Sequence, residues 1–160
     1  MININKLKIL TYPHESLKKK AEEVKQFDDE LKNIVDRMFD LLSKMKGIGL
    51  AAPQIGLPLR IFITSIPDEE KRVFINPVIA SPFGAPTIEK EGCLSLPGFL
   101  YSVPRPRIVT ISAQDIYGKE FNLFGWGISA RCWMHENDHL NGILIKDICV
   151  GSPEKIRSNH

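Results

Sequence analysis

Two histidines stand four positions apart in the stretch Met134-His135-Glu136-Asn137-Asp138-His139, which reads H-E-x-x-H. On a helix, residues at this spacing project from one face, one turn apart. Two imidazoles placed in this way can bind one divalent metal ion, with the intervening Glu136 beside a metal-bound water. The alternative is that both histidines are ordinary polar surface residues, because a lone H-E-x-x-H also occurs by chance.

A catalytic metal site usually has three protein ligands and one open position, so a third ligand must come from elsewhere in the chain. No glutamate follows at the distance typical of thermolysin-like peptidases, and no third histidine follows in the metzincin pattern. Cys93 is the best candidate, because it lies in the glycine-containing turn Glu91-Gly92-Cys93 and a thiolate is a strong metal ligand. The alternative role for Cys93 is that of a small buried core residue.

Composition indicates one globular protein with no special partner class. The chain has 160 residues, of which 43% are hydrophobic, and its net charge is +2 from 21 basic and 19 acidic residues. This charge balance gives no reason to expect nucleic acid or an anionic membrane as a partner. No apolar run could span a bilayer and no secretory signal opens the chain, so we expect a cytoplasmic protein. Three cysteines argue against a disulfide framework.

The hydrophobic pattern places helices on either side of a β region. Apolar residues recur at helical spacing from Asp28-Asp29 to Met45, and Gly47 is expected to end this helix. A second helix, from about Ile128 to Asn141, carries the H-E-x-x-H motif. Prolines at positions 77, 82 and 86 are expected to break the chain into short segments. The predicted strands are residues 60–64, 72–75, 100–103, 107–114 and 121–124.

Strands that are adjacent in sequence and flanked by helices predict an α+β fold with a mainly antiparallel sheet, not a doubly wound parallel one. Residues 1–160 are expected to form one catalytic domain. Gly151 and Pro153 interrupt a polar C-terminal segment, so we expect a short irregular tail from about residue 148.

Small residues dominate the stretch 47–56, which contains Gln54. Its spacing matches neither a dinucleotide-binding motif nor a phosphate-binding loop. The glycines indicate a backbone that approaches another group closely, with the amide of Gln54 beside it. The alternative is a simple loop.

Residues 47–54, 91–95 and 135–140, in this order and spacing, resemble the three motifs of the peptide deformylase family. The similarity extends from Leu7 to about Asp147. The family removes the formyl group from the N-terminal formyl-methionine of newly made polypeptides and releases formate. The resemblance implies an α+β fold with mainly antiparallel sheets packed around a central H-E-x-x-H helix.

The resemblance also implies a set of residue roles. Cys93, His135 and His139 would be the metal ligands, and a metal-bound water would attack the formyl carbon with Glu136 as general acid/base. The side chain of Gln54 and the backbone N–H of Leu94 would bind the developing oxyanion. The substrate pocket would be lined by Ile48, Gly49, Ile128, Arg131 and Cys132.

Fe²⁺ is the metal that the resemblance implies, with Zn²⁺, Ni²⁺ or Co²⁺ able to replace it, although the residue types alone allow zinc equally well. The implied partners are N-formylmethionyl peptides and nascent chains. Many relatives continue after about residue 147 as a helix implicated in ribosome docking. The short tail here puts a transient ribosome contact in question.

Two residues depart from the family pattern. Met134 stands where glutamine is common, and Arg131 stands where an apolar residue is common, which predicts a more polar pocket rim. Asp138 is expected to orient a ligand histidine or a neighbouring backbone. Glu91 and Arg105 are either a buried pair that steadies the Cys93 turn or two surface charges.

Two other functions compete with the deformylase interpretation. One is a zinc peptidase, which would cleave internal peptide bonds. The other is a catalytically inactive protein that binds nascent N-termini, and the presence of Glu136 and Gln54 argues against it.

Overall fold

The computed structural model describes residues 2–156 of the chain.

The first long helix, α1 (Asp29–Met45), begins where the sequence predicts it. The side chain of Asp28 accepts a hydrogen bond from the Leu31 N–H and so caps the helix. The left-handed residue that ends α1 is Lys46 (φ 54°) and not Gly47 as expected. At Gly47, one position later, a Cβ would lie 2.9 Å from Leu42 Cδ1, so any other residue would displace that side chain.

Two antiparallel sheets make up the β region, which confirms the predicted α+β fold. In the described residues the larger sheet has the strand order β1-β2-β3-β6-β7, and the smaller has the order β4-β5-β8. Every neighbouring pair is antiparallel. The strands of the larger sheet are β1 (Gly49–Ala51), β2 (Ile61–Thr64), β3 (Arg72–Phe83), β6 (Ile108–Gln114) and β7 (Glu120–Trp126). Those of the smaller are β4 (Thr87–Glu91), β5 (Phe99–Arg105) and β8 (Glu154–Lys155).

Strand β3 and the tail differ from expectation. We expected prolines to break the chain after residue 75, but β3 continues to Phe83 because its pairing with β6 shifts register between Ile75 and Val78 and between Ala80 and Phe83. Pro77 and Pro82 fall within these two irregularities, where a missing N–H is tolerated. The expected irregular tail contains β8, which pairs with Phe99 and Leu100 of β5.

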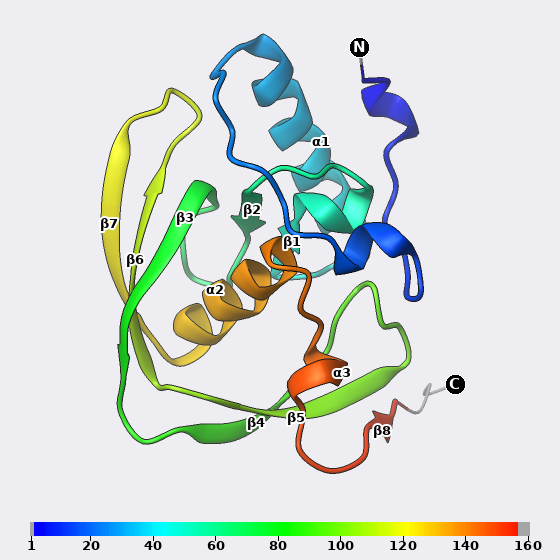
Figure 1. Cartoon of the computed structure of the whole chain (residues 1–160), viewed down its shortest axis with the longest axis vertical. Helices are drawn as coiled ribbons and strands as arrows, with labels where there is room; N and C mark the ends of the chain where they lie inside the picture. The colour runs from blue at the N-terminus through cyan, green and yellow to red at the C-terminus, as the bar shows by residue number, and fades with distance from the viewer. Residues whose placement is uncertain (1, 157–160) are drawn as a thin grey trace.

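Helix α2 (Gly127–Leu140) lies at the centre of the molecule, with α1 above it and β4 and β5 below it in the view of Figure 1. It packs against the larger sheet, where Trp133 contacts Phe74 with ring centroids 5.7 Å apart. On its other side, ion pairs from Arg105 to Asp138 and from Arg131 to Glu91 connect it to the smaller sheet. The helix is therefore held from two sides, which fixes the residues it carries.

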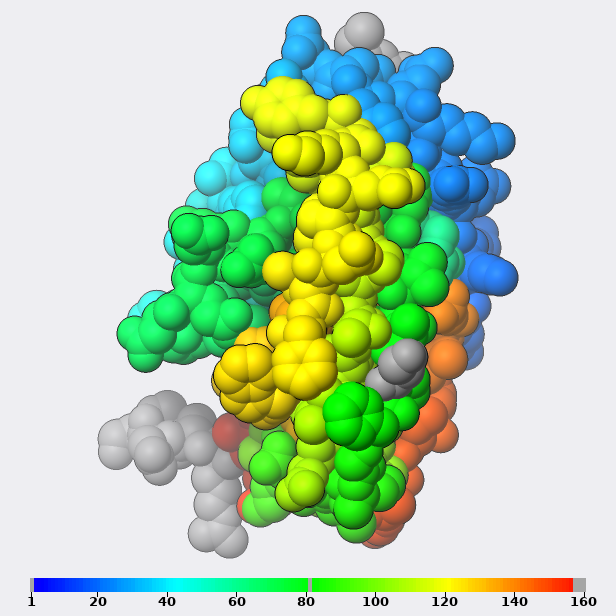
Figure 2. Space-filling model, turned by 90° about the vertical axis from the view of Figure 1, so that its left-hand side faces the viewer, coloured from blue at the N-terminus to red at the C-terminus, as the bar shows by residue number. Residues whose placement is uncertain are grey.

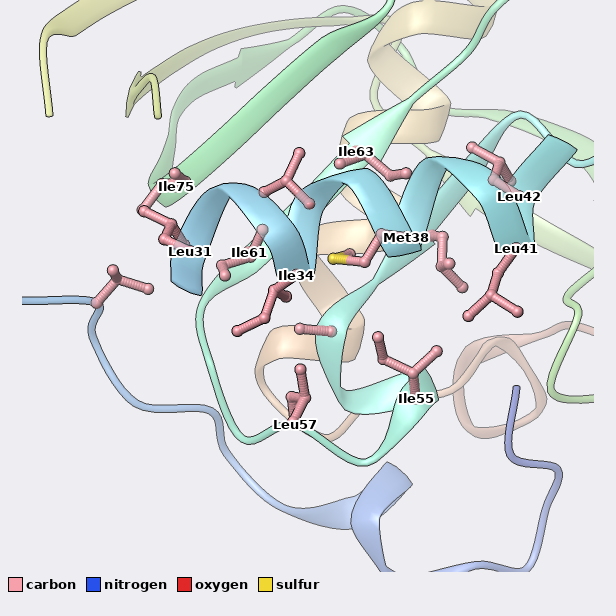
Figure 3. Close-up of a cluster of buried hydrophobic side chains, with 14 residues drawn as sticks. Leu31, Ile34, Met38, Leu41, Leu42, Ile55, Leu57, Ile61, Ile63 and Ile75 are labelled. Carbon is pink, nitrogen blue, oxygen red and sulfur yellow. The ribbon is translucent and has the colours of Figure 1, made fainter. Parts of the chain in front are cut away.

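The largest cluster of buried apolar residues lies between α1 and the start of the larger sheet. Met38 of α1 lies among Ile61 and Ile63 of β2 and Ile55, as Figure 3 shows. Ile55 belongs to the short 3-10 helix η3 (Ala52–Ile55), which directly follows β1. This cluster holds β1 and η3 in place, and both segments contribute to the site described below.

The remaining short helices are η1 (Ile4–Lys6), η2 (Glu15–Lys18) and α3 (Ile145–Ile148). None of the helices among residues 2–156 has the length and apolar composition that a membrane span requires.

Candidate active site

Three side chains that could bind one metal ion meet between α2 and the turn after β4. They are Cys93, His135 and His139, and one potential ligand atom from each lies within 4.8 Å of the others. Cys93 Sγ lies 3.4 Å from His139 Nε2. Both histidines are buried, because the motif face of α2 points into the molecule. The helix thus places the pair away from the surface, contrary to the interpretation of them as surface residues.

The chemistry of these three groups fits a divalent metal ion. A tetrahedral ion with bonds of about 2.0–2.3 Å separates its ligand atoms by about 3.5 Å, close to the observed sulfur–nitrogen distance. One thiol and two imidazoles suit Zn²⁺ and Fe²⁺. The neighbouring Glu136 supports the fit, because within the described part of the chain its buried Oε1 has no hydrogen-bond partner. Buried carboxylate oxygens usually have one.

The carboxylate of Glu91 holds His135 in position. Glu91 Oε1 lies 2.8 Å from His135 Nδ1, which leaves His135 Nε2 available on the other edge of the ring. Arg105 donates two hydrogen bonds to the same carboxylate, of 2.6 and 2.9 Å. Burial favours a higher pKa for Glu91, but the hydrogen bonds from His135 and Arg105 outweigh it and lower the pKa to about 2. Glu91 is therefore an anion that orients the imidazole.

Asp138 has a different role from the one we expected. Its Oδ2 accepts a hydrogen bond of 3.0 Å from Arg105 Nη1, so it orients the arginine rather than a histidine. Glu91 and Arg105 are a buried ion pair, at 6% and 5% side-chain exposure, and not surface charges. Sequence reasoning missed the contact from Glu91 to His135, because nothing in the spacing shows which acid reaches the ring.

Replacing Glu91 with glutamine is expected to weaken metal binding by about 10–100-fold, because an amide holds the His135 ring less strongly than a carboxylate does. It also leaves Arg105 with less compensation for its buried charge. Metal affinity measured by competition with a chromophoric chelator checks this. Glu89, 63% exposed on the same strand, gives the matched control Glu89→Gln, which should bind metal as the wild type does. Unchanged affinity in Glu91→Gln would remove Glu91 from the site.

Glu136 lies next to the histidines and is buried. Its Oε2 is 4.0 Å from His135 Nε2. Burial raises the pKa of Glu136 to about 7, although the charge of the neighbouring His135 acts to lower it. A carboxyl group with such a pKa can both accept and release a proton near neutral pH.

The glycine-containing stretch 47–56 approaches this carboxylate closely, as the sequence indicated. A Cβ on Gly49 would lie 2.6 Å from Glu136 Oε2 and 2.9 Å from Cys132 Sγ, so only glycine leaves room for both side chains. The stretch is not a simple loop, because it forms β1 and then η3.

Gln54 at η3 points its amide toward the cysteine. Its Oε1 accepts a hydrogen bond of 2.9 Å from the Ala51 N–H, which fixes the orientation of the amide. Its Nε2 donates to Ser95 Oγ at 3.1 Å and lies 3.7 Å from Cys93 Sγ. Leu94 lies between Cys93 and Ser95 in the chain. Ser95 was not singled out from sequence, because a serine in a turn carries no signal of its partner.

The predicted pocket residues do meet in one cavity of about 530 Å³ that opens from the metal-ligand cluster to the surface. Ile48, Gly49, Ile128, Arg131 and Cys132 all line it. Arg131 also binds Glu91 at 2.7 Å and Glu89 at 3.0 Å, so its charge is compensated on the β4 side of the cavity. Met134 is buried among apolar residues near Trp133, which is consistent with a packing role.

Fold and site together define a class: an α+β protein whose central H-E-x-x-H helix can bind a metal ion together with a cysteine from a neighbouring turn. Comparison with known proteins gives the family. The family model described as polypeptide deformylase matches residues 6–153. The chain belongs to the peptide deformylase family.

Individual relatives agree with this assignment. The chain is 45% identical over 140 residues to a peptide deformylase of Chromobacterium violaceum, covering 86% of this chain and 83% of that protein. It is 39% identical over 145 residues to the chloroplastic peptide deformylase 1B of rice, covering 88% of this chain but 54% of the rice protein. The chain thus spans about half the length of this plant relative.

A solved structure shows the same fold. The crystal structure of a peptide deformylase from Legionella pneumophila matches with a TM-score of 0.86 and 42% identity, covering 90% of this chain and 86% of that one.

Proposed function

We propose that this chain is a metal-dependent hydrolase that removes the formyl group from the N-terminal formyl-methionine of newly made polypeptides. The observation that carries the proposal is the juxtaposition of Glu136 with the group formed by Cys93, His135 and His139 at the inner end of a largely apolar pocket. The names of the relatives support the same reaction.

The pocket suits a peptide that begins with methionine. Ile48, Ile128 and Cys132 give it apolar walls that can take up a thioether side chain. Gly49 exposes backbone where a substrate backbone would pass. We assign these residues and Arg131 to substrate binding, with the formyl group directed at Glu136.

Bound to Cys93, His135 and His139, a divalent ion would supply Lewis acidity, which can lower the pKa of water from 15.7 to about 7. Glu136 takes a proton from the attacking water as its oxygen bonds to the formyl carbon. The formyl oxygen gains negative charge, and Gln54 Nε2 and the Leu94 N–H donate hydrogen bonds to it. Glu136 then gives the proton to the amine nitrogen, the C–N bond breaks, and formate and a free N-terminus result.

Fe²⁺ is the metal we propose, since the family resemblance implies it, and Zn²⁺, Ni²⁺ and Co²⁺ also suit the donor set. The substrate class places the reaction where polypeptides are made, which for a bacterial protein is the cytoplasm. Within the described residues, the segment after α2 forms α3 and β8 and no long helix, so this part of the chain does not supply the helix that is implicated in ribosome docking in many relatives.

The proposal is tested by incubating the protein, purified without oxygen, with a formyl-Met-Ala-Ser peptide and measuring formate. We expect stoichiometric release of formate and a new free amine, and no reaction with the matched acetyl-Met-Ala-Ser peptide. Cleavage of internal peptide bonds without formate would instead support a zinc peptidase. Tight binding of the formyl peptide without any turnover would support an inactive binding protein.

A further inference from the structure

A second groove lies beside the catalytic pocket, and the proposed chemistry makes no use of it. This distal groove has a volume of about 450 Å³. It runs along the end of β7 and the first turn of α2, with Glu69 and Arg72 on its other side. Ile128 lines both the distal groove and the catalytic pocket, so the two cavities meet at this side chain.

Exposed apolar side chains line the distal groove. Phe124 is 53% exposed, Trp126 66% and Ile128 54%. The rings of Phe124 and Trp126 lie with centroids 5.9 Å apart and form one aromatic surface. Figure 2 shows the face of the molecule along which the end of β7 runs, with ring side chains standing out at the surface. Large contiguous exposed apolar surfaces commonly mark interaction sites, which makes this groove a candidate for one.

Aromatic surface forms part of the base of the distal groove. Gly125 has no side chain between Phe124 and Trp126, and the buried ring of Trp133 occupies the space beneath it. A Cβ on Gly125 would lie 2.3 Å from Trp133 Cζ3. On the other side, Ser129 Oγ donates a hydrogen bond to Glu69 Oε2 and joins the first turn of α2 to the segment before β3. This hydrogen bond connects the two sides of the groove.

We propose that the distal groove binds the part of the nascent polypeptide that follows the residues held in the catalytic pocket, from about the fourth residue on. This inference rests on the proposed function. A polypeptide substrate continues beyond its first residues, and an extended chain advances about 3.3 Å per residue, so it must pass over a neighbouring surface as it leaves the pocket.

Continuity and chemistry favour this occupant. Ile128 lines both the catalytic pocket and the distal groove, so an extended chain that passes this side chain can contact both cavities. The flat faces of Phe124 and Trp126 accept apolar side chains of many shapes, which suits substrates of varied sequence. Arg72 and Glu69 can donate to and accept from a peptide backbone. The groove raises affinity for long substrates without taking part in the chemical step.

The test compares two substrates and a double variant, Phe124→Ala with Trp126→Ala. The substrates are formyl-Met-Ala-Ser and a formyl nonapeptide with the same start and Leu or Phe at positions four to seven. In the wild type we expect a higher kcat/KM for the nonapeptide. In the double variant we expect kcat/KM for the nonapeptide to fall about tenfold, because KM rises while kcat stays the same. The kcat/KM for the tripeptide should equal that of the wild type. Tyr117→Ala, 73% exposed at the far end of the β6–β7 hairpin, should change neither value.

The outcomes separate the two proposals. No formate from the tripeptide in the wild type would reject the proposed function. Formate from the tripeptide with no advantage for the nonapeptide, or an equal loss for both substrates in the double variant, would reject the distal groove as a substrate site. Light scattering tests one more outcome. If the wild type is a dimer, the double variant is a monomer and both have the same peptide kinetics, the surface is a dimer interface and the proposal is overturned.

Discussion

Replacing Glu136 with glutamine is expected to lower kcat for a formyl-Met peptide by about 10²–10⁴-fold while the protein keeps its metal. Glutamine has the shape of glutamate but cannot accept the proton of the attacking water. The metal should stay, because the candidate ligand group consists of Cys93, His135 and His139 and does not include Glu136. Formate release and metal content measured on the same sample check both parts of the expectation.

The control for this variant is Glu120→Gln, since Glu120 is an exposed carboxylate on β7 outside the site. It should match the wild type in both measurements. A Glu136→Gln protein that retains more than about a tenth of the wild-type kcat would remove Glu136 from the proton transfers. Loss of metal together with activity would give Glu136 a role in binding the ion.

Replacing Cys93 with alanine is expected to weaken metal binding by more than about 100-fold and to abolish formate release. A site left with two imidazoles lacks one of the three ligands that catalytic sites usually have. The loss should exceed the 10–100-fold effect typical of residues that only orient a ligand. Metal content after dialysis against a chelator, measured by plasma mass spectrometry, gives the result.

Cys149 supplies the matched control for this variant, because it is also a partly exposed free cysteine but lies after α3 and outside the ligand group. Cys149→Ala should retain metal and activity. If Cys93→Ala kept a full complement of tightly bound ion, the thiol would not be a ligand, and the third position would have to be assigned again.

The parts of the site that sequence predicts are those set by spacing within one element. His135 and His139 share a helix face because helical geometry requires it, and the structure buries that face. Gly49 was expected to approach another group closely, and the group is the carboxylate of Glu136. The roles of Gln54, Leu94 and the pocket residues came from the family resemblance, and they remain proposals.

Contacts between distant elements could not be read from sequence. Glu91 reaches His135 across 44 positions, and Arg105 links that carboxylate to Asp138 on α2. The local sequence around Glu91 fits an exposed charge equally well. Strand β3 was predicted too short because its prolines suggested a break, whereas the pairing with β6 accommodates them by shifts of register. The strand β8 is only two residues long, too short to give an alternating pattern.

X-ray absorption at the metal edge of the wild-type protein, purified without oxygen, tests the central claim most directly. We predict one divalent ion per chain, bound by one sulfur at about 2.3 Å and two imidazole nitrogens at about 2.0–2.1 Å. The sulfur contribution should disappear in any metal that Cys93→Ala retains. A spectrum without sulfur around the ion in the wild type would contradict the account.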